Sequence, residues 1–395
     1  LSESLATGAL LRRGRTLAAE HRCFKCHVPD ASGEGMLELT MDAPSFEGIG
    51  SRLDVEWIVD WLLNPKKLRP SAKMPSMLHG VTAQTDARAI AAYLGSLKSG
   101  KKSNLMQVDE RVVSEGQALY NQLNCAACHT LAGEPAAAAK LSLGQARRKF
   151  IQPAALSEFL QNPQEYYHWI RMPNFTLSEV EANALSAYLF SVATTAKSVP
   201  TAFDALLIAT GKKKVSSMGC LNCHALKLDN SFSVSAISNL DKGCLAELVG
   251  ESVVQFGFSQ EERLALRLFF KKGKSSLGQV SLAEFALRQT ADSNCRNCHG
   301  QMESVPPFEV LGGKLKPDWA EKILNGSLGE RPRPWLQARM PAFPSRASGL
   351  AKGLAMLNGY PPVTPRQAPV DLERGAIGRK LVSANGGFFC FSCHA

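Results

Sequence analysis

The pattern Cys-x-x-Cys-His occurs five times in this chain of 395 residues. The copies use ten of the eleven cysteines and five of the eight histidines. Repetition on this scale is far above chance, so we expect these residues to share one chemistry. The five copies are Cys23, Cys26 and His27; Cys125, Cys128 and His129; Cys220, Cys223 and His224; Cys295, Cys298 and His299; and Cys390, Cys393 and His394.

The spacing fits covalent haem attachment. Two thiols at this separation, on the first turn of a helix, can form thioethers with the two vinyl groups of one haem, and the adjacent histidine then lies under the iron. A zinc site would need four ligands, a thioredoxin-like pair a βαβ setting, and a disulfide framework is typical of short secreted chains. These three alternatives stay open, but the pattern favours five haem c groups, each with one of the five histidines as an iron ligand.

Helices and linkers must position these motifs. A helix is expected before each motif, as in residues 114–124, and segments rich in Pro, Gly, Ser and Lys separate the copies. These segments divide the chain into modules 1–100, 101–198, 199–274, 275–360 and a partial module 361–395. The linker segments are 97–104, 193–201, 271–278 and 358–369.

The modules resemble one another between the motifs. Residues 60–65 (DWLLNP) and 158–163 (EFLQNP) are each followed by a Met-Pro pair, and residues 307–324 align with 45–62. Segments 178–190 and 259–270 have helical apolar spacing, and each opens with a Ser-x-x-Glu capping box. No convincing alternating strand is present. The predicted fold class is all-α: a string of small helical domains, each wrapped on one haem.

Each module resembles a bacterial mono-haem c-type cytochrome domain, and the modules are fused in tandem. The order of motif, Trp-bearing middle helix, Met-Pro turn and closing helix carries this resemblance over nearly the whole chain. It implies that the Met of each Met-Pro turn binds iron opposite the His, where a thioether favours ferrous iron. The implied ligands are Met74, Met172 and Met340, with Met77, His79 and His168 as second choices.

The resemblance also implies that a proline carbonyl holds the proximal imidazole. Pro44 fits this role in the first module and Pro306 fits it in the fourth, whereas the second module has no proline in that slot. Such a hydrogen bond orients the ring toward the metal.

The third module departs from the pattern. Alignment of Ser259 with Ser178 places Val253 where the methionine should lie. Its haem is therefore five-coordinate or has an unusual ligand, for which Cys244, Lys242 or a residue from a neighbouring module are candidates. A free cysteine is more often a small core residue, and Cys244 fits that interpretation as well.

The fifth module has an opening helix and a motif, but nothing that would cover the distal face of its haem. A segment this short cannot bury a haem alone. We expect either further residues beyond Ala395, a partner that completes the pocket, or cover from the fourth module.

Composition narrows the class of protein. The net charge of +10 is offset in large part by the propionates of five haems, and the lysines are scattered, so nucleic-acid binding is disfavoured. The sequence contains no run of eighteen apolar residues, so we expect no membrane-spanning helix. Haem attachment to this motif occurs outside the cytoplasm, so we expect a protein that is periplasmic or otherwise outside the cytoplasm, with a secretion signal that has been removed or is not part of this sequence.

The expected function is electron transfer and not catalysis. A haem with both axial positions filled changes oxidation state but has no place for a substrate. The expected partners are redox proteins: a dehydrogenase, a small cytochrome or a membrane complex. Two alternatives remain: a haem enzyme acting on a sulfur or nitrogen oxyanion or peroxide at an open haem in module 3 or 5, and an electron-accepting subunit of a larger complex.

Overall fold

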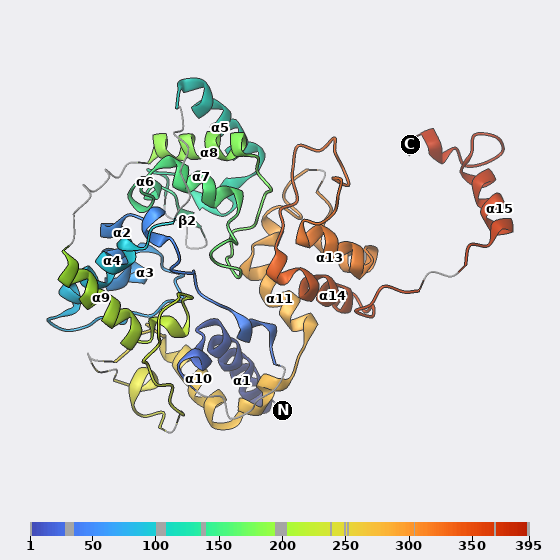
Figure 1. Cartoon of the computed structure of the whole chain (residues 1–395). Helices are drawn as coiled ribbons and strands as arrows, with labels where there is room; N and C mark the ends of the chain where they lie inside the picture. Colours follow the sequence, from blue (N-terminus) through green and yellow to red (C-terminus); the bar gives the residue numbers. More distant parts are fainter. Residues whose placement is uncertain are drawn as a thin grey trace. The chain divides into compact units, whose positions relative to one another are not determined.

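The computed structural model describes residues 2–27, 35–99, 108–135, 140–193, 204–237, 239–248, 250, 253–303, 305–366 and 369–392. These residues are predominantly helical, which confirms the predicted all-α class (Figure 1). The α-helices are α1 (Ser2–Glu20), α2 (Val55–Leu63), α3 (Pro65–Leu68), α4 (Ala83–Ser96), α5 (Glu110–Gln122), α6 (Ala146–Lys149), α7 (Pro153–Gln161), α8 (Glu179–Val192), α9 (Ala205–Ser217), α10 (Gln260–Lys272), α11 (Leu282–Asp292), α12 (Leu311–Lys314), α13 (Pro317–Asn325), α14 (Ala347–Leu357) and α15 (Leu372–Val382).

Strand structure is minimal in the described residues. The strands β1 (His129–Thr130) and β2 (Leu141–Ser142) pair in parallel. Short 3₁₀ helices fill many of the connections, and five of them begin at the first cysteine of a motif. Their bounds are Cys23–Lys25, Leu37–Thr40, Ile49–Ser51, Cys125–Ala127, Cys220–Asn222, Gly243–Leu245, Lys274–Gly278, Cys295–Asn297, Phe308–Val310, Pro344–Arg346 and Cys390–Ser392.

The chain divides into two compact units, residues 1–362 and 363–395. The second unit contains α15 and the fifth motif, and α15 buries none of its residues. None of the helices in the described part of the chain is both long enough and apolar enough to cross a bilayer.

Four helix pairs organise the first unit. In two of them, the helix before a motif packs on the closing helix of its own module: α5 on α8, and α11 on α14. In the other two pairs the partners are exchanged, because α1 packs on α10 and α9 packs on α4 (Figure 1). The predicted modules 1–100 and 199–274 therefore do not pack as two separate domains.

Small residues at the crossings explain why the exchange is possible. A Cβ added to Gly14 in α1 would lie 2.1 Å from the Ala265 carbonyl oxygen, and one added to Gly211 in α9 would lie 1.9 Å from that of Ala89. The unexchanged α5–α8 pair has the same close approach, since a Cβ added to Gly116 would lie 2.0 Å from the Ala184 carbonyl oxygen. These crossings are built alike, so α1 and α9 present similar surfaces to the two closing helices.

The closing helices start where the sequence predicts. Ser178 and Glu181 form a complete capping box at α8, and Ser259 and Glu262 form one at α10. Each box satisfies backbone N–H groups that have no partner inside the helix.

Candidate haem sites

Every motif begins with the same backbone conformation. The residue before the first cysteine is left-handed in all five copies, and a 3₁₀ turn follows it. Four of these residues carry side chains, for which this conformation is costly. Its recurrence indicates that the motif requires this turn, which ends the preceding helix and starts the short 3₁₀ helix that begins at the first cysteine. The residues are Arg22, Asn124, Gly219, Asn294 and Phe389.

Four motif histidines share one hydrogen-bond arrangement. In each, Nδ1 lies within hydrogen-bond distance of a backbone carbonyl oxygen. Because a carbonyl can only accept, Nδ1 carries the proton and Nε2 keeps its lone pair for a metal. The pairs are His27 with Ser235 at 3.1 Å, His129 with Leu141 at 3.2 Å, His224 with Pro44 at 2.7 Å and His299 with Pro306 at 2.9 Å.

The proline prediction holds for one site and is wrong for the other. Pro306 accepts from His299, as the resemblance implies. Pro44 accepts from His224 and not from His27, because the third motif, and not the first, packs against residues 41–97. Burial lowers the pKa of His224 to about 4, so its imidazole is neutral at physiological pH and suited to a metal.

Four motifs line one continuous, mainly apolar cavity of about 1950 Å³. A pocket for one small molecule or cofactor occupies roughly 300–1,000 Å³, so this cavity has room for several. The cysteines and histidines of the motifs at 23–27, 125–129, 220–224 and 295–299 all face it. Of the fifth motif, Cys390 lies in the second unit, whereas Cys393 and His394 lie outside the described residues.

The cysteines do not favour the alternative chemistries. Those that the structure describes are all unpaired, which gives no support to a disulfide framework. Burial raises the pKa of Cys23 and Cys125 to about 12 and of Cys220 and Cys295 to about 11, so the thiols are protonated. Within the described ranges, no three His, Cys, Asp or Glu side chains are grouped to hold a metal ion, as a zinc site would require.

The three methionines of the Met-Pro turns line the cavity, but one of them packs beside a different motif than expected. Met74 packs in the core that holds Cys220, and its sulfur accepts a hydrogen bond from Trp61 Nε1 at 3.0 Å. Met172 packs in the core of Cys125. Met340 is 41% exposed and lines the cavity together with Cys295.

The second-choice ligands are less suitable. His79 Nε2 lies 3.0 Å from the Ser76 carbonyl oxygen, and His168, whose side chain is 75% exposed, is paired with Asp42 at 3.0 Å. Only Met77 among them lines the cavity.

The loops that carry these methionines pair with one another. Asn174 and Ala342 exchange two backbone hydrogen bonds, of 2.9 and 2.7 Å, and each lies two residues after a methionine, Met172 or Met340. Ser76 and Gln255 exchange bonds of 2.9 and 3.0 Å in the same way.

The pairing of Ser76 with Gln255 also identifies the loop position at which the methionine is missing. Ser76 lies two residues after Met74, and Gln255 lies two residues after Val253. Val253 therefore occupies the methionine position, as the alignment predicts. Because α10 packs on α1, however, the segment that follows Val253 meets the first motif: Phe256 and Phe258 pack in the core that contains Cys23. Cys244 packs in this same core.

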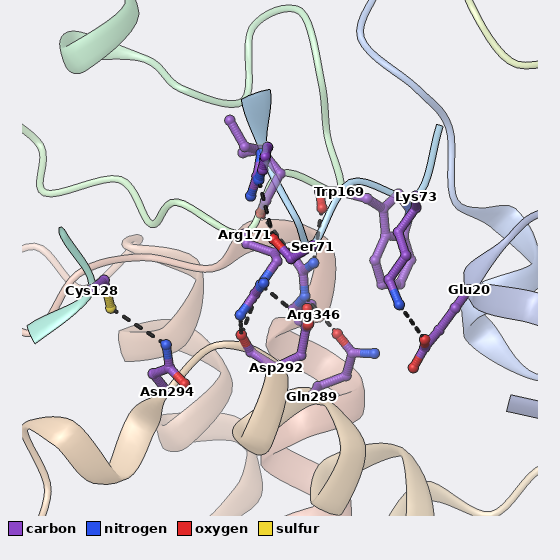
Figure 2. A network of polar contacts seen from close by, with 12 residues as sticks. Glu20, Ser71, Lys73, Cys128, Trp169, Arg171, Gln289, Asp292, Asn294 and Arg346 are labelled. Atoms are coloured by element: carbon purple, nitrogen blue, oxygen red, sulfur yellow. Dashed lines mark hydrogen bonds and ion pairs between the residues drawn. The ribbon is translucent and has the colours of Figure 1, made fainter. Parts of the chain in front are cut away.

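The motifs lie against one another in two pairs. Asn124 Nδ2 approaches the Cys298 sulfur at 3.9 Å, and Asn294 Nδ2 approaches the Cys128 sulfur at 3.7 Å (Figure 2). In the other pair, Asn222 Nδ2 approaches the Cys26 sulfur at 3.7 Å. The second motif thus adjoins the fourth, and the first adjoins the third.

The cavity is strongly cationic: thirteen Lys and Arg line it against five Asp and Glu. Burial lowers the pKa of Arg52, Arg69 and Arg346, and that of Lys149 to about 8. The Nε atoms of Arg22 and Arg52 are buried without a hydrogen-bond partner. Buried cations require anionic partners, and haem propionates would supply them.

A polar network joins the second module to the fourth, next to their adjoining motifs (Figure 2). Arg171 bonds to the backbone and carboxylate of Asp292, and Arg346 bonds to Gln289 at 2.7 Å and to the Trp169 carbonyl at 2.8 Å. These contacts fix the second and fourth modules together.

Comparison with known proteins supports this assignment for one part of the chain. Residues 111–189 match a family model described as cytochrome C oxidase, cbb3-type, subunit III. This segment contains the motif at 125–129, Met172 and most of the α5–α8 pair. No curated protein and no solved structure matches the chain. The match supports a c-type cytochrome domain at residues 111–189, and with it haem-based electron transfer.

Several residues of the site escape sequence reasoning. The carbonyls of Ser235 and Leu141 carry no sequence signal, since any residue supplies a carbonyl. The Asn–sulfur contacts between motifs depend on tertiary packing alone. Only the packing of Met74 beside the third motif is hinted at in the sequence, because the third module has no Met-Pro pair of its own.

Proposed function

We propose that this chain is a multihaem c-type cytochrome that relays electrons through five covalently bound haems between redox partners outside the cytoplasm. The observation that carries the proposal is the single cavity shared by four motifs, within which the motifs adjoin in pairs. Adjoining sites let an electron pass between haems inside the protein. The bound haem supplies the change of oxidation state, and the chain positions it.

Each residue type has one role in this proposal. The ten motif cysteines attach the haems. His27, His129, His224, His299 and His394 bind the irons, with Nδ1 of the first four fixed by a backbone carbonyl. Met74, Met172 and Met340 complete the haems on His224, His129 and His299. The cationic side chains of the cavity neutralise the propionates.

A role as an electron-accepting subunit of a larger complex is a second candidate, favoured by the unit of residues 363–395. Leu372 is 81% exposed and Phe388 is 80% exposed. Apolar side chains with this exposure are suited to burial by a protein partner.

A reductive titration tests the relay. The purified protein should take up five electrons per chain, and a C220A/C223A variant should take up four. After mixing with substoichiometric reductant, the electron should redistribute among the haems at a rate independent of protein concentration. Uptake of a single electron, or redistribution that depends on concentration, would contradict the proposal.

A further inference from the structure

One site differs from the other three in the first unit. The motif at 23–27 lies in the α1–α10 core, and the paired loops place Val253 where the other sites have a methionine. Between His224 and Met302 the sequence has no methionine, and its only histidine is His299 of the next motif. The segment that covers this site, residues 235–272, therefore offers neither of the usual distal ligands.

The core around this motif is built mainly of apolar side chains. Val253, Val254 and Phe256 line the cavity together with Cys23 and His27. His21 lines it too, although it is only 9% exposed. The rings of Phe256 and Phe258 meet His21 edge-on, at centroid distances of 5.4 and 4.9 Å.

His21 lacks a partner that its burial would require. Its Nδ1 is buried without any hydrogen bond. A buried polar atom without a partner is costly, so we expect it to bond to something that enters the cavity. Two neighbouring basic side chains have partners of their own: one NH2 group of Arg22 donates to the Tyr167 hydroxyl at 2.8 Å, and Lys73 pairs with Glu20 at 2.5 Å (Figure 2).

We propose that the haem at Cys23, Cys26 and His27 keeps its sixth iron position open and binds a small uncharged diatomic molecule there, beneath Val253 and Phe256 and beside His21. This inference rests on the proposed function only in that a haem occupies the motif. Valine and phenylalanine offer the iron no lone pair. An uncharged ligand suits the apolar side chains of this core, and His21 supplies one polar contact to it.

Three side chains compete as internal ligands and define the controls. Met36, 4% exposed, and Cys244 pack in the same core, and His21 itself carries imidazole nitrogens. If one of them bound the iron, replacing it would turn a low-spin haem into a high-spin haem. If the position is open, replacing Met36 with Leu or Cys244 with Ala leaves the spin state unchanged.

Carbon monoxide titration of the ferrous protein is the test. The wild type should bind CO at this haem, and C23A/C26A should lose one haem and one equivalent of CO together. Val253→Met should keep the haem, lose that equivalent of CO and lose one high-spin signal, whereas the control Val253→Leu should retain both. His21→Leu should keep the stoichiometry, shift the C–O stretching frequency and speed CO release about five- to tenfold, as loss of one hydrogen bond predicts.

The outcomes separate the two proposals. If haem analysis shows no loss in C23A/C26A, the motif holds no haem and the proposed function itself fails at this site. If the haem is present but binds no CO, or becomes high-spin only in M36L, C244A or H21L, the open position is wrong while the relay stands.

Discussion

The residue types of the motifs indicate the chemistry, whereas tertiary packing decides which other side chains lie beside each motif. Met74 illustrates this second point. By sequence it follows the first motif, but in space it packs in the core that holds Cys220, the first cysteine of the motif whose histidine bonds to Pro44. A side chain can therefore pack beside a motif that begins 146 residues away in the sequence.

Replacing Met74 with Leu should make the haem on His224 high-spin and leave the haem on His27 unchanged. The physical reason is loss of the thioether that raises the potential and completes the low-spin iron. The measurement is the electronic spectrum in two backgrounds. M74L should add a new high-spin signal in C23A/C26A, which lacks the first haem, and none in C220A/C223A. The opposite pattern would show that Met74 serves the first motif.

At the scale of helices, the exchanged pairs α9–α4 and α1–α10 are both held by close crossings. The crossing of α9 with α4 depends on Gly211, and that of α1 with α10 depends on Gly14. Both glycines lie nine residues before the first cysteine of their motif, as does Gly116. Since the crossings are built alike, geometry at the contact does not select the partner.

Gly211→Ala should destabilise the first unit by about 1–3 kcal/mol, because the new Cβ would meet backbone 1.9 Å away. Denaturant unfolding monitored by haem absorbance gives the value. Gly375→Ala is the matched control: it also lies inside a helix, but nothing lies within 4 Å of its new Cβ. It should be neutral or slightly stabilising. Equal effects of the two changes would argue against the α9–α4 crossing.

Glu181 links α8 to the loop of Met340 through its bond to Arg339. The Arg339 side chain holds the pKa of Glu181 below its ordinary value. A carboxylate with a lowered pKa stabilises the fold above its unfolded pKa and loses that contribution as pH falls through the folded pKa. The melting temperature of Glu181→Gln should therefore lie below that of the wild type at pH 7, and the gap should close in acid. A gap that persists at pH 2 would show that charge is not the cause.

The sequence predicts the helices and motifs well, but it does not predict which helices pack on one another. The motifs, the capping boxes at Ser178 and Ser259, and the Val253 position in the methionine slot follow from local patterns. The exchange does not, because Gly14 and Gly211 encode similar helix surfaces. The carbonyl of Ser235 near His27 could not be predicted either, since backbone groups leave no signature in the sequence.

At the scale of the whole molecule, the relay requires that the sites be filled and adjoining. Four motifs of the first unit line the same cavity. Lys and Arg outnumber Asp and Glu in its lining, so anionic groups inside it would be favoured. A chain with fewer haems would leave the buried Nε atoms of Arg22 and Arg52 without the partner that a propionate would supply. Haem number is thus the quantity on which the other conclusions depend.

The most direct test is the intact mass of the purified protein, followed by mapping of its peptides. The account predicts a mass that exceeds the polypeptide by five haems, with one haem on each peptide that contains Cys23, Cys125, Cys220, Cys295 or Cys390. A mass equal to the polypeptide alone, or motif peptides that carry free thiols or zinc, would contradict it.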